Sequence, residues 1–342
     1  MRPFFTLLFI TACTTSVVAQ NDSAMLFLQK AADEKSKGRV MEQYKALDKA
    51  YMYNKTNKAV VQELADVLVT LRRYPQAREK YQELEKMGAA TAQTYKQLME
   101  LSFTTRQFPE AIKYAQMVKK TDPSQKVAYY IGKASYEQES YGDAIKYLTE
   151  ATAEDAQNPE IPYYIARSYA DMSNYKAAIP AFQKAIALKP TDSRWIYEMA
   201  LIYYGMHDDK SALKYLLEAA EKGYKQDAEY MENLSIAYLN TGDVDKGIGV
   251  LKELLQKRPS DAHILEMLAD ASYNAKKWDD AIGYWDQLLG LDKQNAAALY
   301  MIGMSYQKKG DKAKGQALCD KAIQMDPTLA GNKQKMNMPG GL

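Results

Sequence analysis

The sequence predicts an all-α protein, a solenoid of nine helix–turn–helix repeats that fill residues 24–329. The first observation is self-similarity, because Ala166 and Tyr169 recur 34 residues later as Ala200 and Tyr203. The second is that small, bulky and proline residues keep their offsets from one unit to the next, which is typical of a repeat array. The units are 24–57, 58–91, 92–124, 125–158, 159–192, 193–227, 228–261, 262–295 and 296–329.

Residues 159–192 show why each unit forms a pair of helices. The apolar residues of its second half recur at three and four residues, as on one face of a helix. They are Tyr175, Ala178, Ile179, Phe182, Ala185 and Ile186. Ala166 and Ala178 are short enough for two helices to approach closely, and Pro190 ends the second helix because it lacks an N–H donor. One pair cannot bury its own apolar stripe, so neighbouring units are expected to stack into a solenoid.

Local departures from the pattern carry their own predictions. The first unit is the weakest, because Lys30 and Glu34 stand where other units are apolar, as in many terminal caps. Pro180 lies about five residues into its helix, so we expect a kink or loosening there. Gly223 is placed to end a helix in the left-handed conformation.

Composition excludes several classes of protein. Lys and Arg total 45 and Asp and Glu 43, a net charge of +2, which is too balanced for a nucleic-acid-binding surface. Two cysteines and two histidines leave no material for a disulfide framework or a zinc site. We expect His207 and His263 to be solvated and Cys319 to pack as a small apolar residue. No phosphate-binding loop or catalytic motif is present, so we expect no enzyme, no cofactor and no metal site.

The repeating offsets of small, tyrosine, alanine, bulky and proline residues resemble the tetratricopeptide repeat across residues 24–329. This resemblance implies a right-handed superhelix in which the second, fifth, ninth and twelfth residues of each unit face a concave groove. The residues predicted to bind a ligand there are Lys126, Tyr129, Lys133, Tyr136, Tyr163, Arg167, Arg194, Tyr197 and Tyr204. No ninth position is asparagine, which argues against the carboxylate clamp of some family members. A looser preference for acidic ligands is expected around Lys133 and Arg167.

The two ends of the chain are expected to lie outside the solenoid of residues 20–329. Residues 1–19 read as a signal peptide, with a basic start, an apolar core and cleavage before Gln20. A rival interpretation takes Ile10–Cys13 as a lipobox, which would make Cys13 a lipidation site. We expect residues 330–342 to be disordered. Export would place the mature protein in the periplasm or at the outer membrane of a bacterium, with secretion as another outcome.

Three functional classes follow from these features. The leading one is a scaffold of the cell envelope that binds a protein or peptide partner, which the preference expected around Lys133 and Arg167 would make an acidic one. The alternative is a glycan-binding protein that stacks sugar rings on the concave row of tyrosines. Tyrosine outnumbers phenylalanine by 27 to 7, so most aromatic positions carry a hydroxyl. An enzyme would need a site built between repeats. No nucleic-acid partner is expected, and membrane contact would come through a lipid anchor or a partner.

Overall fold

The computed structural model describes residues 6–331, with side chains from residue 21 onward. Across these residues the chain forms α-helices with one short 3-10 helix and no strand, which confirms the all-α solenoid of paired helices. The backbone of residues 6–20 belongs to the first helix. The side chain of Cys13, the predicted lipidation site, is not described, and of the predicted tail 330–342 the residues from 332 onward lie outside the described residues.

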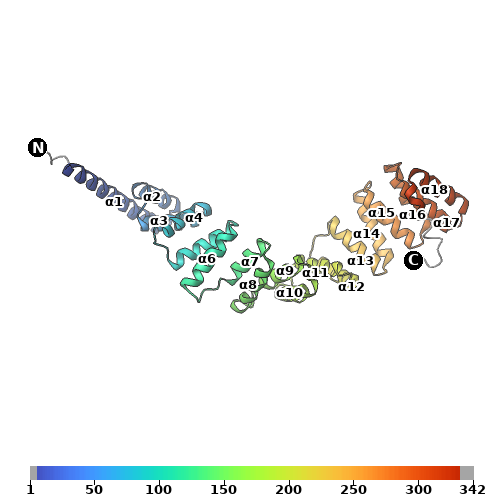
Figure 1. The fold of residues 1–342 in the computed structure, drawn as a ribbon, viewed down its shortest axis with the longest axis horizontal. Helices are drawn as coiled ribbons and strands as arrows, with labels where there is room; N and C mark the ends of the chain where they lie inside the picture. Colours follow the sequence, from blue (N-terminus) through green and yellow to red (C-terminus); the bar gives the residue numbers. More distant parts are fainter. Residues whose placement is uncertain (1–5, 332–342) are drawn as a thin grey trace. The chain divides into compact units, whose positions relative to one another are not determined.

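The chain divides into two compact units, Met1–Leu188 and Lys189–Leu342. The first unit contains five consecutive helix pairs, which can be followed along the ribbon in Figure 1. These helices are α1 (Thr6–Ser36), α2 (Val40–Tyr53), α3 (Lys58–Thr70), α4 (Tyr74–Lys86), α5 (Ala92–Thr104), α6 (Phe108–Thr121), α7 (Ala128–Glu137), α8 (Tyr141–Glu154), α9 (Glu160–Asp171) and α10 (Tyr175–Leu188). Each helix packs against the next, so the unit grows by stacking neighbours in sequence.

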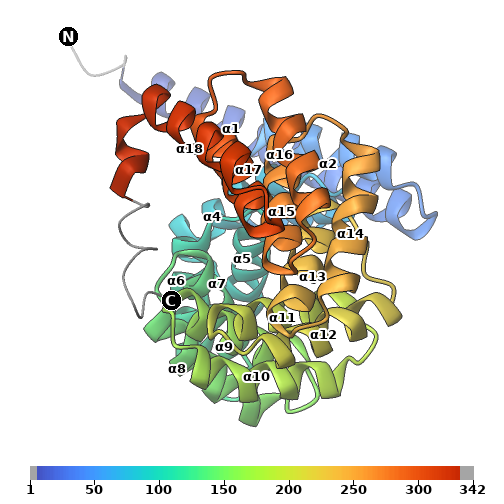
Figure 2. The ribbon, with the colours of Figure 1, turned by 90° about the vertical axis from the view of Figure 1, so that its right-hand side faces the viewer.

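The second unit contains four further pairs. Its helices are α11 (Ser193–Gly205), α12 (Asp209–Glu221), α13 (Ala228–Asn240), α14 (Val244–Lys257), α15 (Ala262–Asn274), α16 (Trp278–Leu291), α17 (Ala296–Lys309) and α18 (Lys312–Met325), followed by the 3-10 helix η1 (Pro327–Leu329). Figure 2 shows α17 and α18 side by side, the arrangement that recurs within every pair. The predicted repeat boundaries, and a single solenoid over 20–329, stay predictions.

Small residues let the helices of a pair approach closely, as the sequence predicted. Ala166 on α9 and Ala178 on α10 are both fully buried. Gly132 on α7 has no room for a side chain, because a Cβ there would lie 2.7 Å from Cγ of Leu148 and 2.9 Å from its backbone nitrogen. Cys319 is also buried, as expected for a small apolar residue.

One residue of positive φ turns the chain inside each helix pair. These residues are Gly38, Arg72, Arg106, Glu139, Ser173, His207, Gly242, Lys276 and Gly310. Six of them are not glycine, so their left-handed conformation carries a backbone cost that the packing of the pair must offset. His207 therefore has a structural place, in the turn between α11 and α12, and it is exposed there as expected.

Two irregular positions can be compared with their predictions. Gly223 adopts φ +88° after α12, which confirms the left-handed helix stop. α10 continues through Pro180 from Tyr175 to Leu188, and the kink or loosening expected at this proline stays a prediction.

Candidate binding surface

The first helices of three pairs in the first unit bring a set of aromatic rings together, which we call the tyrosine cluster. It consists of Phe103 on α5, Tyr129, Tyr130 and Tyr136 on α7, and Tyr163 and Tyr164 on α9. Ring centroids lie 5.5 Å apart for Phe103 and Tyr130, and 5.2 Å apart for Tyr136 and Tyr164. Most of these contacts are edge-on or tilted, the geometry that aromatic rings favour. The cluster therefore holds its rings in fixed orientations.

Lys133 lies at the centre of the tyrosine cluster. Its ammonium group is 4.7 Å from the ring centroid of Tyr164 and 5.5 Å from that of Tyr129. It donates hydrogen bonds to Oε2 of Glu160 at 2.8 Å and to the hydroxyl of Tyr129 at 3.1 Å. Tyr129 in turn donates to the same carboxylate. Only 18% of the Lys133 side chain is exposed, so its charge is enclosed by rings and balanced by Glu160.

The pKa values of this group follow from its surroundings. Burial lowers the pKa of Lys133, but the hydrogen bonds to Glu160 and Tyr129 outweigh burial and raise it above its usual value. Burial and the hydrogen bond to Glu160 raise the pKa of Tyr129. At neutral pH the cluster therefore contains a protonated lysine beside a carboxylate.

Arg167 is balanced in the same way on α9. Its Nη2 lies 3.9 Å from Oδ1 of Asp171, and its guanidinium is 6.0 Å from the ring centroid of Tyr136. Tyr136 donates a hydrogen bond to Oδ2 of Asp171 at 2.9 Å. Both cations predicted to attract acidic ligands thus have a carboxylate beside them. A neighbouring carboxylate weakens the attraction of each cation for an acidic ligand, and the acidic character of the partner stays a prediction.

The remaining candidates of the first unit differ in exposure. Tyr163 is only 5% exposed, and its ring packs against Phe182 at 6.1 Å between centroids, so it cannot offer a free ring face as the sequence predicted. Lys126 lies in the loop before α7 and is exposed. No ion pair of Lys126 is found within 4 Å among the described residues.

Three candidates, Arg194, Tyr197 and Tyr204, belong to the second unit. Tyr197 is 5% exposed and stacks on Tyr224 with centroids 4.2 Å apart, which again corrects the prediction of a ring open to a groove. The side-chain amide of Asn233 donates to the Tyr197 hydroxyl at 2.9 Å. Burial raises the pKa of Tyr197. Arg194 is exposed and lies 3.7 Å from Glu198, and Tyr204 is 38% exposed.

Repeat position alone did not identify Glu160 and Asp171, the two carboxylates that pair with the cations beside the tyrosine cluster. Glu160 is the second residue of its unit, one of the positions expected to face the groove, so its place was available from the sequence. Asp171 is the thirteenth residue, one beyond those positions. Neither the pairing with Lys133 nor that with Arg167 could be read from spacing, because each depends on side-chain conformation.

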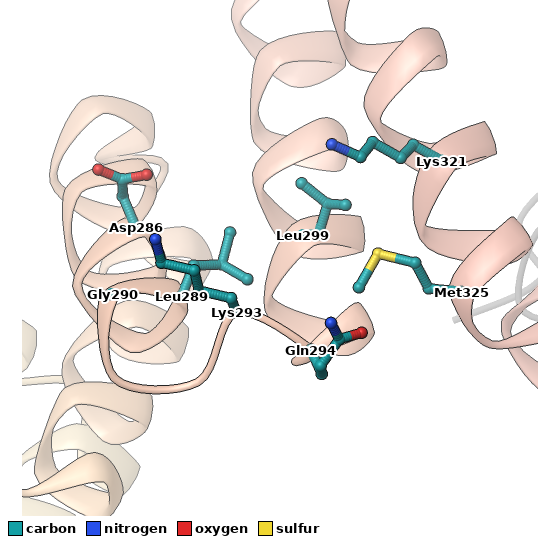
Figure 3. A pocket seen from close by; sticks show the side chains of 8 residues that line it. All are labelled: Asp286, Leu289, Gly290, Lys293, Gln294, Leu299, Lys321 and Met325. Atoms are coloured by element: carbon teal, nitrogen blue, oxygen red, sulfur yellow. The ribbon is translucent and has the colours of Figure 1, made fainter.

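A second feature is an open pocket of about 610 Å³ in the second unit, shown in Figure 3. It lies between the end of α16, the start of α17 and the end of α18. Its lining residues are Asp286, Leu289, Gly290, Lys293, Gln294, Leu299, Lys321 and Met325.

Among residues 21–331, no three His, Cys, Asp or Glu side chains are grouped so as to hold a metal ion. Among the helices described, none combines the length and the apolar character that a membrane span requires.

Several solved structures resemble this chain in fold, and two of them are described as TPR proteins. The C-terminal part of a TPR repeat-containing protein from Cytophaga hutchinsonii is 17% identical, with 80% of this chain and 99% of that chain covered and a TM-score of 0.50. YrrB, described as a TPR protein with an unusual peptide-binding site, is 19% identical over 55% of this chain and 97% of its own, with a TM-score of 0.46. PilF of Pseudomonas aeruginosa is 18% identical over 74% of this chain and 99% of its own, with a TM-score of 0.39. At such low sequence identity, the similarity shows the fold alone.

Family models give the decisive comparison. A tetratricopeptide repeat model matches residues 16–294, and a second one matches residues 266–330. Among curated proteins no sequence matches the chain. Repeats of this family are typically non-catalytic scaffolds through which proteins bind one another. The chain therefore belongs to the tetratricopeptide repeat family, as a scaffold for protein–protein interaction.

Proposed function

We propose that this protein is exported to the cell envelope and there holds an extended peptide or a helix of a partner protein against the tyrosine cluster of the first unit. The observation that supports the proposal best is the preorganised group of rings and paired charges around Lys133. Rings held by their neighbours lose little conformational entropy on binding, and tyrosine offers both an apolar face and a hydrogen-bonding hydroxyl.

The two ion pairs of this surface limit which side chains a partner can present to it. An acidic side chain would have to compete with Glu160 for Lys133 and with Asp171 for Arg167. We therefore propose that the cluster binds neutral or apolar side chains by packing and by hydrogen bonds to its hydroxyl and carboxylate groups. The acidic character of the partner stays part of the proposal only beside the exposed Lys126.

Protein binding is favoured over glycan binding by the burial of the rings. Stacking of a sugar requires an open ring face, and Tyr163 and Tyr197 are almost fully covered. We also propose a non-enzymatic role, because proteins with this fold are typically non-catalytic scaffolds.

Capture of the partner by crosslinking in cells tests the proposal. The test variant is Tyr136→Ala with Arg167→Ala, which removes one half-buried ring and the cation near it. The matched control is Tyr147→Ala with Lys146→Ala on α8, where a lysine lies 5.0 Å from a tyrosine ring in the same way. We expect a partner crosslinked to the wild type and the control but lost from the test variant. Equal capture by all three, with folding verified by circular dichroism, would refute binding at the tyrosine cluster.

Export has a separate test. Cleavage before Gln20 predicts a mature N-terminus at that residue and unchanged fractionation of a Cys13→Ser variant. Loss of membrane association in that variant would support lipidation instead. A cytoplasmic protein that still carries residues 1–19 would refute export.

A further inference from the structure

The pocket at the end of the second unit lies apart from the tyrosine cluster and uses different helices. Leu289 on α16, Leu299 on α17 and Met325 on α18 form its apolar lining, and Figure 3 shows their side chains among the other lining residues. Gly290 adds no side chain to the α16 wall, where a Cβ would meet no atom within 4 Å. The volume of about 610 Å³ is in the range of binding pockets for small ligands or for a few side chains.

The charged groups of the pocket are not balanced against one another. Lys293, in the loop after α16, and Lys321, on α18, are both exposed, and Asp286 is the acidic residue of the lining. In the described part of the chain neither lysine has a carboxylate within ion-pair distance. This differs from Lys133 and Arg167, whose carboxylate partners are already in place. The pocket therefore combines an apolar floor with an excess of one positive charge.

We propose that this pocket binds a peptide segment of a partner protein that presents a carboxylate beside an aliphatic side chain. The aliphatic side chain would pack on Leu289, Leu299 and Met325, and the carboxylate would lie within reach of Lys293 or Lys321. Burial of apolar surface supplies the affinity, and the lysines select against a neutral segment. A peptide fits better than an enclosed small molecule because the pocket is open along the side of the helices.

A binding experiment on the full chain tests this site directly. The probes are the peptide acetyl-Ala-Leu-Glu-Leu-Ala-amide and its neutral counterpart with glutamine in place of glutamate. The readout is methyl NMR of methionine-labelled protein, with the Met325 signal assigned through a Met325→Leu variant and Met231 on α13 as the reference. We expect the glutamate peptide to shift Met325 saturably at millimolar concentration, to leave Met231 unmoved, and to bind more tightly than the glutamine peptide.

Variants with matched controls test the role of each feature. Lys293→Gln with Lys321→Gln should weaken binding about 5-fold, the upper range for exposed ion pairs, while Lys308→Gln with Lys312→Gln should not. Gly290→Leu should fill the pocket and prevent the Met325 shift, while Gly283→Leu, two turns earlier on the same face of α16, should not. The Tyr136→Ala, Arg167→Ala variant should bind normally, so this site can fail without affecting the proposed function.

Three results would overturn the proposal. One is the absence of any shift of the Met325 methyl signal at the highest concentration at which the peptide dissolves. Another is equal binding of the glutamate and glutamine peptides, or equal binding to the Lys293→Gln, Lys321→Gln variant. The third is a Met325 shift without peptide when residues 332–342 are deleted, which would assign the pocket to the chain's own end.

Discussion

Gly315 on α18 offers a direct test of how the last helix pair packs. A Cβ at this position would lie 2.5 Å from the backbone oxygen of Gly303 and 2.8 Å from the backbone nitrogen of Gln307. Both atoms belong to the backbone of α17 and cannot move aside as a flexible side chain could. Gly315→Ala should therefore force the two helices apart. Overpacking of this kind costs about 1–3 kcal/mol, and alanine returns about 1 kcal/mol through helix propensity.

Gly249→Ala on α14 is the matched control, because a Cβ there meets nothing within 4 Å. It should stabilise its helix by about 0.5–1 kcal/mol. Both substitutions gain helix propensity, so the difference in stability between the two variants is the overpacking cost alone, roughly 1–3 kcal/mol, with Gly315→Ala the less stable. Urea unfolding followed by circular dichroism measures both, and hydrogen exchange of the α17 and α18 amides localises the effect. If the two variants unfolded at the same urea concentration, the close approach of α17 and α18 would be wrong.

Three further predictions concern single positions. Pro180→Ala should stabilise the first unit by about 1–3 kcal/mol in urea unfolding, because it restores a backbone donor inside α10, and a loss of stability would mean that the proline ring is needed for packing. Lys276→Gly should raise stability by about 0.5–1 kcal/mol by relieving a residue at φ +58°, and an unchanged melting temperature would argue against strain there. Burial raises the pKa of Tyr230 to about 12, so its neutral form stabilises the fold fully below pH 10, and this contribution is lost as the pH rises toward 12. Ultraviolet titration should show several late-titrating tyrosines, because burial also raises the pKa of Tyr129 and Tyr197, and Tyr230→Phe should remove one of them; an unchanged number would assign the signal near pH 12 to another ring.

The fold could be predicted from the sequence because its main determinant is periodic. Helix pairs follow from apolar residues at three- and four-residue spacing, and the close contacts fall on small residues such as Ala178, which is fully buried. The left-handed turns were predicted only in part. A glycine in the sequence indicates such a turn. Arg72 and Lys276 give no such indication, because their left-handed conformation is imposed by the two helices that they join.

The binding surface could be predicted only as far as the helix face. Repeat position placed Tyr129 and Tyr136 among the rings that gather in the first unit. It did not give depth, because burial depends on what the neighbouring helices add. Tyr197 is covered by Tyr224, which comes from the junction after α12 rather than from a repeat position. The pocket beside α18 was missed altogether, because its floor joins residues of three helices that share no motif.

The difference in charge balance between the two surfaces leads to a difference in salt dependence. When the chain folds, the ammonium group of Lys133 loses bound water and instead contacts Glu160, the Tyr129 hydroxyl and three nearby rings, one of which is that of Tyr129. A partner at the tyrosine cluster therefore gains little binding energy from the charge of Lys133. Lys293 and Lys321 remain open, and attraction between exposed charges is screened over about 8 Å at physiological ionic strength. Added salt should therefore weaken peptide binding at the pocket while leaving capture at the tyrosine cluster nearly unchanged. A steep loss of capture at the cluster with salt would mean that Lys133 or Arg167 leaves its carboxylate to meet the partner, and the neutral recognition proposed for this surface would then be wrong.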